Sequence, residues 1–288
     1  MFQIIGIVLL FGMVFGSYIL AGGKMSIILQ SLPFEMMMIG GAAVGAFAVG
    51  NTMSSLKQTA RDTLKVFKGS QWKAEDYTLL LQVLYQLINL ARKNPVGLEA
   101  HIDNPQDSDI FAQFPKLLRD HAALDIICDT LRSAAMNYDD PMQVEELLDK
   151  KIEETKHHLE HSVHGLQSIA DGLPALGIVA AVLGVIKTMG SIDQPPEVLG
   201  KLIGGALVGT FLGVFLAYCL VAPFALKVKA AADDDIYFYR TIKEVFVSHL
   251  HQHPPKMCLE VARQGIPHHH RPGFSALDDA IRAIKINA

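Results

Sequence analysis

The sequence predicts an all-α membrane protein with four transmembrane helices, a helical cytoplasmic domain between the second and third spans, and a cytoplasmic C-terminal helical tail. Half of the 288 residues are hydrophobic, and the mean hydropathy is +0.28. Four apolar stretches contain no Asp, Glu, Lys or Arg: residues 2–23, 36–56, 172–186 and 202–226. As a helix, the last stretch would be about 37 Å long, which exceeds the roughly 30 Å hydrocarbon core of a bilayer.

The basic residues assign the two sides of the membrane. All but three of the 25 Lys and Arg residues lie in segments 54–170 and 227–288. Basic residues close to the ends of spans favour the cytoplasmic side. Both termini and the long middle segment are therefore predicted to be cytoplasmic. The first span has neither a basic start nor a small-residue cleavage pattern, so we interpret it as a permanent helix.

These observations divide the chain into four segments. We expect two transmembrane helices with a short outer loop, a cytoplasmic helical domain, two further transmembrane helices that line an ion path, and a cytoplasmic tail. The boundaries are 1–53, 54–170, 171–226 and 227–288.

The cytoplasmic middle has the pattern of helices. Apolar residues recur at helical spacing over 75–93, and Asn94, Pro95 and Gly97 then end the pattern. Asp140-Pro141 has the residue types of an N-cap followed by a first helical position. The helix that starts there could continue into the third span as a rigid stalk, or end in a helical hairpin; the sequence leaves both open.

Composition and motifs argue against several functional classes. A net charge of −4 argues against nucleic acid as a partner, and no enzyme motif occurs. The three cysteines have no paired spacing. Histidines gather at helical spacing within 157–164 and in the run His268–His270. Such tracts can bind metal, but no Cys or acid completes a ligand set in the sequence, so we expect solvated surface and no metal site.

The spans are poor in ionisable groups. Glu35 and Asp171 fall at the ends of the apolar stretches, so no carboxylate is expected at mid-depth. Ion carriers usually keep an ionisable group there. If the chain serves an ion path, a partner must therefore supply the carboxylate.

Small residues form faces on the inner spans. They either pack the chain's own helices together or form a smooth surface for a partner helix, and the sequence leaves both open. The glycines concerned are Gly177, Gly184, Gly205, Gly209 and Gly213.

Two prolines and a threonine also mark these spans. Pro174 lies near the cytoplasmic start of the third and Pro223 near the cytoplasmic end of the fourth; each is expected to kink its helix. Thr210 is a rare hydroxyl in the fourth span. It could bind water or a partner group, or simply its own backbone.

The paired inner spans resemble those of the MotA family of flagellar motor stator proteins, within the wider family that includes the ExbB and TolQ energisers. The resemblance extends through most of the chain. Its segments are "DGLPALGIVAAVLGVIKTMGS" (171–191), "LIGGALVGTFLGVFLAYCLVAPFA" (202–225), "GSYILAGG" (16–23), "GNTMSSLKQTA" (50–60), "LEAHIDNPQDSDIF" (98–111) and "RPGFSALDDAIRAIK" (271–285).

This resemblance implies a function and partners. Subunits of the family form a ring, thought to be a pentamer, in the bacterial inner membrane around a MotB-like dimer anchored in peptidoglycan. The partner carries the protonatable Asp. Proton flow, with no other cofactor, makes the ring step and push the rotor protein FliG.

The resemblance also implies residue roles. Pro174 and Pro223 match the prolines that couple protonation to movement, and Thr210 matches the hydroxyl on the ion route. Ala181 stands where sodium-driven relatives carry Thr, which favours protons.

Arg92 and Glu99 match a charged pair that meets FliG. The segment between them is one residue shorter here, so Lys93 could share the basic role.

Two other classes remain. An ExbB/TolQ-type energiser of outer-membrane processes would be favoured by three spans and an outer N-terminus. A self-sufficient transporter should carry an intramembrane charge or internal repeats, and the sequence indicates neither.

Overall fold

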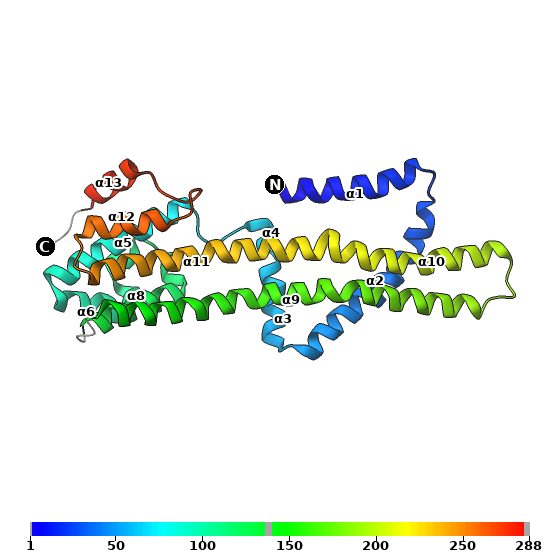
Figure 1. The fold of residues 1–288 in the computed structure, drawn as a ribbon, viewed down its shortest axis with the longest axis horizontal. Coiled ribbons are helices and arrows are strands. Elements are labelled where there is room, and N and C mark those ends of the chain that lie inside the picture. Colours follow the sequence, from blue (N-terminus) through cyan, green and yellow to red (C-terminus); the bar gives the residue numbers. More distant parts are fainter. Residues whose placement is uncertain (1, 136–139, 285–288) are drawn as a thin grey trace. The chain divides into compact units, whose positions relative to one another are not determined.

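All regular elements in residues 2–135 and 140–284, the part of the chain that the computed structural model describes, are helices. The predicted all-α fold is confirmed. The chain forms two compact units: Met1–Gly69 with Leu159–Ala231, and Ser70–His158 with Ala232–Ala288. We call them the membrane unit and the head unit, and describe each by itself. Figure 1 shows their helices in sequence colours.

Among the described residues, four helices are long and apolar enough to span a membrane, as predicted. They begin with α1 (Phe2–Leu20) and α2 (Met25–Gly50), followed by α9 (Pro141–Met189). The fourth is a continuous helical run made of α10 (Pro196–Phe215), the π-helical turn η3 (Leu216–Val221) and α11 (Ala222–Leu250).

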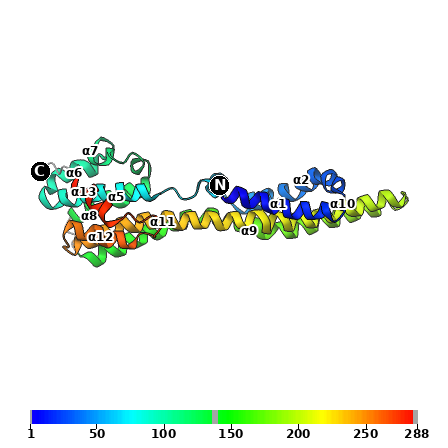
Figure 2. The ribbon, with the colours of Figure 1, turned by 90° about the horizontal axis from the view of Figure 1, so that it is seen from above.

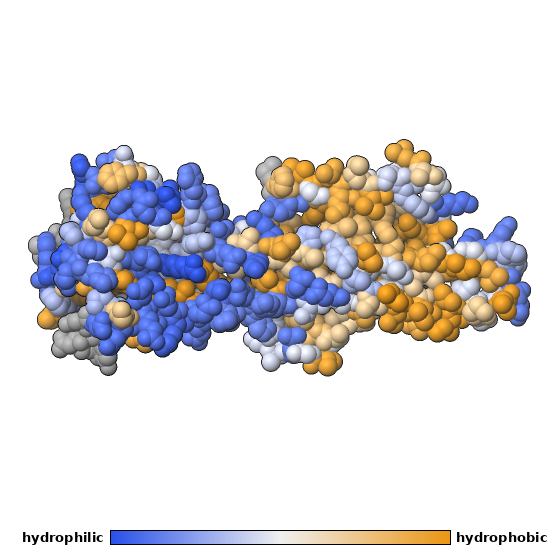
Figure 3. All heavy atoms as spheres, in the orientation of Figure 1, coloured by the Kyte–Doolittle hydropathy of each residue, from blue (hydrophilic) through white to orange (hydrophobic). Residues whose placement is uncertain are grey.

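Within the membrane unit, α1 and α2 both contact α10. Phe11 of α1 meets Phe215 edge-on with ring centroids 5.2 Å apart, and Phe15 meets Phe211 at 5.9 Å. Figure 2 shows α1 and α2 alongside α10. Many large apolar side chains of this unit remain exposed, and Figure 3 shows them as its orange surface. Such a surface is expected of helices that face lipid, not water.

Two short helices follow α2 in the membrane unit, α3 (Met53–Thr63) and α4 (Lys65–Lys68). The side chain of Thr52 caps α3 by accepting a hydrogen bond from the backbone N–H of Ser55. At the other end of α3, the hydroxyl of Ser162 donates to the buried carboxylate of Asp62 at 2.6 Å. This charge-assisted bond ties α3 to α9.

The head unit contains the remaining helices, and Figure 3 shows its mostly hydrophilic surface. They are α5 (Ala74–Lys93), α6 (Pro95–Asp103), η1 (Pro105–Asp107), α7 (Asp109–Ala112), η2 (Leu117–Arg119), α8 (His121–Ala135), α12 (Pro255–Gly265) and α13 (Phe274–Arg282). The ends of α9 and α11 complete it.

The core of the head unit centres on Trp72, which is fully buried. Its ring stacks on Phe238 with centroids 3.8 Å apart, and the ammonium of Lys116 lies over its face at 4.8 Å. A carboxylate oxygen of Asp235 accepts the backbone N–H groups of Gln71 and Trp72. One aromatic stack and one buried carboxylate therefore hold the start of the head unit against α11.

The helices predicted between the second and third spans are confirmed. The pattern over 75–93 is α5, which ends at Lys93. The helix predicted from Asp140-Pro141 is α9, and an Asp140 carboxylate oxygen accepts the N–H of Met142 at 3.0 Å, as an N-cap does. Helix α9 is continuous for 49 residues; its action as a stalk stays a prediction.

Candidate functional site

Helices α9 and α10 approach each other backbone to backbone. A Cβ atom placed on Gly177 would lie 2.9 Å from the carbonyl oxygen of Gly209 and 3.0 Å from the Cα of Gly213. A Cβ on Gly213 would lie 2.7 Å from the carbonyl oxygen of Leu173. Only glycine fits at these positions, since small residues are what lets helix backbones meet in lipid.

The other predicted glycines also lie inside the chain's own packing. A Cβ on Gly184 would lie 2.6 Å from the Cβ of Ala206, and one on Gly205 would lie 2.9 Å from the hydroxyl of Ser31 on α2. The internal-packing interpretation thus accounts for all five glycines. A partner-facing role for any of them stays a prediction.

The predicted position of Glu35 was wrong. It was expected at the end of a span, but α2 begins at Met25, so ten helical residues precede Glu35 and fifteen follow it. Its side chain packs against α10: a Cβ on Gly209 would lie 2.7 Å from the Glu35 Oε2 atom. Glu35 is 6% exposed, and Oε2 has no hydrogen-bond partner among the described residues. The membrane unit therefore carries a buried carboxylate of its own.

The environment of Glu35 is polar on one side. A hollow of ≈ 580 Å³ is lined by Glu35 and, among others, by Ser31, Lys187 and Lys201. The two lysines come from the ends of α9 and α10 that adjoin their connecting loop. Glu35 thus borders a cavity with both hydroxyl and ammonium groups.

A signal for Glu35 was present in the sequence. Residues 25–34 contain no charged side chain, and Gln30, Ser31 and Pro33 are each tolerated in membrane helices. A span of 26 residues, about 39 Å long, would have placed Glu35 in its interior.

The two predicted prolines lie in different local structures. Pro174 lies inside α9, which continues on both sides of it. Pro223 is the second residue of α11, one residue after the end of the π-helical turn η3. At this turn the N–H of Ala222 donates to the carbonyl of Ala217 five residues earlier. Such turns accommodate a missing helical hydrogen bond and often occur at functional sites. Their role as hinges stays a prediction.

Thr210 and Ala181 lie close to the Gly209 contact. Ala181 is half-buried, and its backbone nitrogen lies 3.3 Å from a Cβ placed on Gly209. Thr210 follows Gly209 on α10. Within the described part of the chain no hydrogen bond involves the Thr210 hydroxyl, whereas Thr188 bonds its own helix at the carbonyl of Gly184. The Thr210 hydroxyl is therefore available to a water or a partner group.

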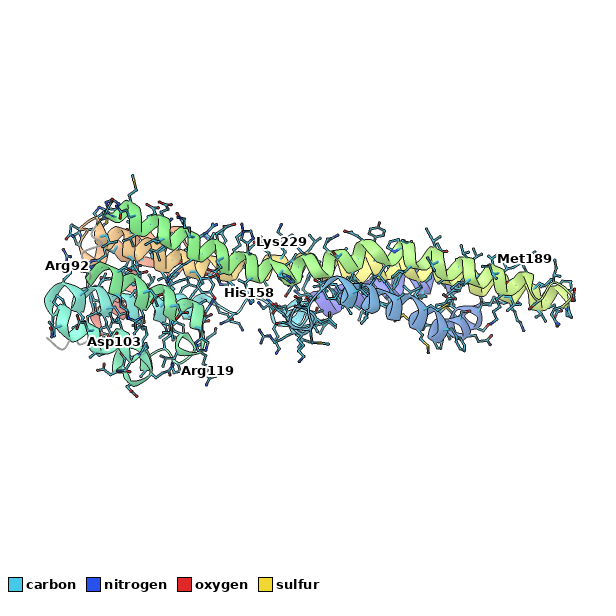
Figure 4. All side chains as sticks on the ribbon, turned by 90° about the horizontal axis from the view of Figure 1, so that it is seen from below. Arg92, Asp103, Arg119, His158, Met189 and Lys229 are labelled. Carbon is cyan, nitrogen blue, oxygen red and sulfur yellow. The ribbon has the colours of Figure 1, made fainter. Side chains whose placement is uncertain are left out.

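The three predicted rotor-contact residues lie together in the head unit, on two helices joined at Asn94. Arg92 and Lys93 end α5 and are exposed, and Glu99 lies on α6 and is also exposed. Figure 4 labels Arg92 in the head unit, at the left of the picture. The Arg92 guanidinium donates to the carbonyl of His253 at 3.4 Å. All three charges are exposed, as a docking site requires, but contact with a rotor stays a prediction.

Sequence reasoning missed a second polar cluster in the head unit. It found no acid beside the run His268–His270, but the structure places Asp234 of α11 against His269 and His270. The two segments are 35 residues apart, so spacing alone gave no signal.

Comparisons with known proteins point to the same family along the whole chain. Residues 4–95 match the family model described as Motility protein A N-terminal, and residues 120–240 match that of the MotA/TolQ/ExbB proton channel family. The chain is 35% identical over 286 residues to Motility protein A of Escherichia coli (strain K12), covering 99% of this chain and 96% of that one. It is 32% identical to the chemotaxis protein LafT of Vibrio parahaemolyticus, covering 96% of each.

Two solved structures share the fold. A chain in the structure of C. jejuni MotAB matches with a TM-score of 0.70 at 20% identity, covering 92% of this chain and 95% of that one. A chain in the flagellar MotAB stator complex from Bacillus subtilis matches with a TM-score of 0.66 at 22% identity, covering 89% and 92%.

Proposed function

The chain belongs to the Motility protein A branch of the MotA/TolQ/ExbB proton channel family, and we propose that it is the torque-generating stator subunit of a flagellar motor. The observation that carries this proposal is the similarity to Motility protein A chains along essentially the full length. The protein is embedded in a membrane by its four apolar helices. We assign it to the bacterial inner membrane, with both termini in the cytoplasm.

The ExbB/TolQ-type alternative is less well supported. The proton channel family model over 120–240 is shared by both classes, but the Motility protein A model over 4–95 is not. Four candidate spans in the described part of the chain, in place of three, favour the stator.

The proposed assembly is a ring of these chains, most simply a pentamer, around a MotB-like dimer anchored in peptidoglycan. The fold is that of chains in MotAB complexes. The partner supplies the carboxylate that binds and releases the coupling proton. Ala181 in place of a hydroxyl residue favours protons over sodium, because its methyl group offers no oxygen to coordinate a metal cation.

Within this chain, Thr210 and Glu35 are the polar groups that we assign to the ion route. Thr210 offers a hydroxyl on α10 that makes no hydrogen bond with the described residues. Glu35 offers a buried carboxylate oxygen beside Gly209, in a setting where an ionisable group is costly and is usually retained for function. Pro174 lies in α9, which packs against α10 beside this region, and Pro223 lies in α11, which continues the helical run of α10. We assign both prolines to the coupling of proton passage to movement, through a change in helix bend.

Rotor contact is assigned to Arg92, Lys93 and Glu99, which would meet opposite charges on FliG. Exposed ion pairs contribute about 0–1 kcal/mol each and are screened by salt. Loss of one charge should therefore weaken torque without abolishing it. Glu99→Lys should reduce swimming speed, and reversal of the facing rotor charge should restore part of it. Unchanged speed with Glu99→Lys would remove Glu99 from the interface.

The function is tested by deletion and complementation in the bacterium that makes this chain. We expect flagella that assemble but do not turn. The wild-type chain should restore swimming, a protonophore should stop it, and replacing sodium by potassium should have no effect. Normal swimming of the deletion strain, with loss of an outer-membrane uptake process, would support the ExbB-like alternative. Stopping on removal of sodium would contradict the assignment of protons.

A further inference from the structure

We propose that the head unit binds one divalent transition-metal ion, with Zn²⁺ as the best-fitting metal, through Asp234, His269 and His270. One nitrogen of each imidazole and a carboxylate oxygen of Asp234 lie within 4.8 Å of one another. The site joins α11 to the turn between α12 and α13. It is independent of the proposed stator function.

The turn that carries the two histidines is held by hydrogen bonds that do not involve their imidazole rings. The N–H groups of His270 and Arg271 both donate to the carbonyl of Pro267 at 2.9 Å, which closes the turn. The guanidinium of Arg271 donates to the carbonyls of Ile266 and Gln264. The turn is therefore fixed by bonds that leave both histidine rings free to bind a ligand.

The opposite side of the site is also anchored. The hydroxyl of Tyr77 on α5 donates to the backbone carbonyl of Asp234 at 3.4 Å, and the ring of Tyr77 stacks on His270 with centroids 5.6 Å apart and planes 21° apart. Tyr77 thus touches both the acid and one of the histidines. Its contacts hold the backbone of Asp234 and the ring of His270 on the same side of α5.

An ion pair alone does not explain the cluster. The Nε2 atom of His269 lies 3.5 Å from a carboxylate oxygen of Asp234, which a protonated imidazole would satisfy. However, Nε2 of His270 is buried and has no hydrogen-bond partner among the described residues. A buried polar atom without a partner costs about 1–3 kcal/mol. A metal ion bound by Asp234, His269 and the Nε2 atom of His270 would give this nitrogen the partner that it lacks among the described residues.

The donor set and the spacing fit a metal ion of intermediate softness, such as Zn²⁺. Two imidazoles and one carboxylate are a known type of zinc ligand set, with bonds of about 2.0–2.2 Å. Ligand atoms in a tetrahedral site are then about 3.3–3.6 Å apart, which the His269–Asp234 distance already matches. The terminal torsions of His and Asp are broad, so small ring rotations can bring in the third ligand. Three protein ligands leave one position for water, and the ring of His269, 60% exposed, leaves the site open to solvent.

The test is Zn²⁺ binding to the purified full-length chain in detergent, with an affinity tag that contains no histidine. Zn²⁺ is titrated in competition with a chromophoric zinc indicator. We expect one high-affinity ion per chain. His270→Gln and Asp234→Asn should each weaken binding at least tenfold, since removing even an outer partner of a zinc ligand costs about 10–100-fold. Zn²⁺ should also raise the thermal midpoint of the wild type and not that of Asp234→Asn, because a ligand that binds only the folded state stabilises it.

His268→Gln is the matched control. His268 is exposed, lies in the same turn and is not part of the cluster, so its replacement should leave the affinity within about threefold of the wild type. Equal loss with His268→Gln would show unspecific binding by the histidine run and overturn the proposal. Unchanged binding with His270→Gln or Asp234→Asn, or no saturable binding to the wild type, would also overturn it. Circular dichroism of each variant confirms that the helices are retained, so a loss of binding is not a loss of fold.

Discussion

The backbone contact between α9 and α10 gives the most direct prediction, tested by Gly213→Ala. The added methyl group would lie 2.7 Å from the carbonyl oxygen of Leu173 and 2.8 Å from the Cα of Gly177, whereas ordinary contact begins near 3.4 Å. Both atoms are backbone and cannot rotate away. The helices must therefore separate by about 0.7 Å, the difference between 3.4 and 2.7 Å, and a gap of this size forfeits a quarter to a half of the dispersion energy of each affected contact.

Gly200→Ala is the matched control, because it lies on the same helix and its added methyl group would meet nothing within 4 Å. Both changes bring the same gain in helix propensity from replacing glycine with alanine. The difference in stability between the two variants therefore isolates the overpacking cost of about 1–3 kcal/mol at Gly213. We expect the thermal midpoint of Gly213→Ala, followed by circular dichroism in detergent, to be lower by about 2–4 °C per kcal/mol. Swimming speed should fall in parallel. Equal midpoints for the two variants would refute the backbone contact.

Three further changes test the other features. Glu35→Gln should slow swimming at an unchanged protein level, whereas Glu35→Asp should keep part of the speed, because the carboxylate and not the packing is needed. Equal swimming speeds for Glu35→Gln and the wild type would exclude Glu35 from the ion route. Pro174→Ala should paralyse the motor and leave membrane insertion intact, and normal motility would exclude a hinge at Pro174. Burial raises the pKa of the Cys128 thiol to about 11, so at pH 8 only about one thiol in a thousand is ionised. Its alkylation should be more than a hundredfold slower in the folded protein than in urea, and comparable rates would contradict the buried position.

Much of the fold followed from local patterns. The absence of charge over about 20 residues is a local signal for a span. The end of α5 at Asn94 and the start of α9 at Asp140 are likewise set by residues that are neighbours in sequence. These features need no knowledge of the tertiary structure. The second span shows the limit of the approach, because a rule based on absent charge starts the span after Glu35, whereas the structure starts the helix at Met25.

The candidate site was less accessible, because its contacts join distant segments. The glycine pattern predicted a close approach but not its partner: Gly209 lies against Glu35 of α2 as well as against Ala180 and Ala181 of α9. Helical spacing gives the face of one helix and carries no information about which helix covers it.

The same limit explains the histidine run and decides how it should now be interpreted. From the sequence, His268–His270 is one exposed tract of equivalent residues, and solvated surface is the simplest interpretation. The fold makes the three unequal: His268 is exposed, His269 faces Asp234, and His270 stacks on Tyr77 with a buried nitrogen. A tract that binds metal unspecifically should respond alike to replacement of any of the three. A built site should respond to His269 and His270 and not to His268, so the comparison of these neighbours separates the two interpretations within one segment of the chain.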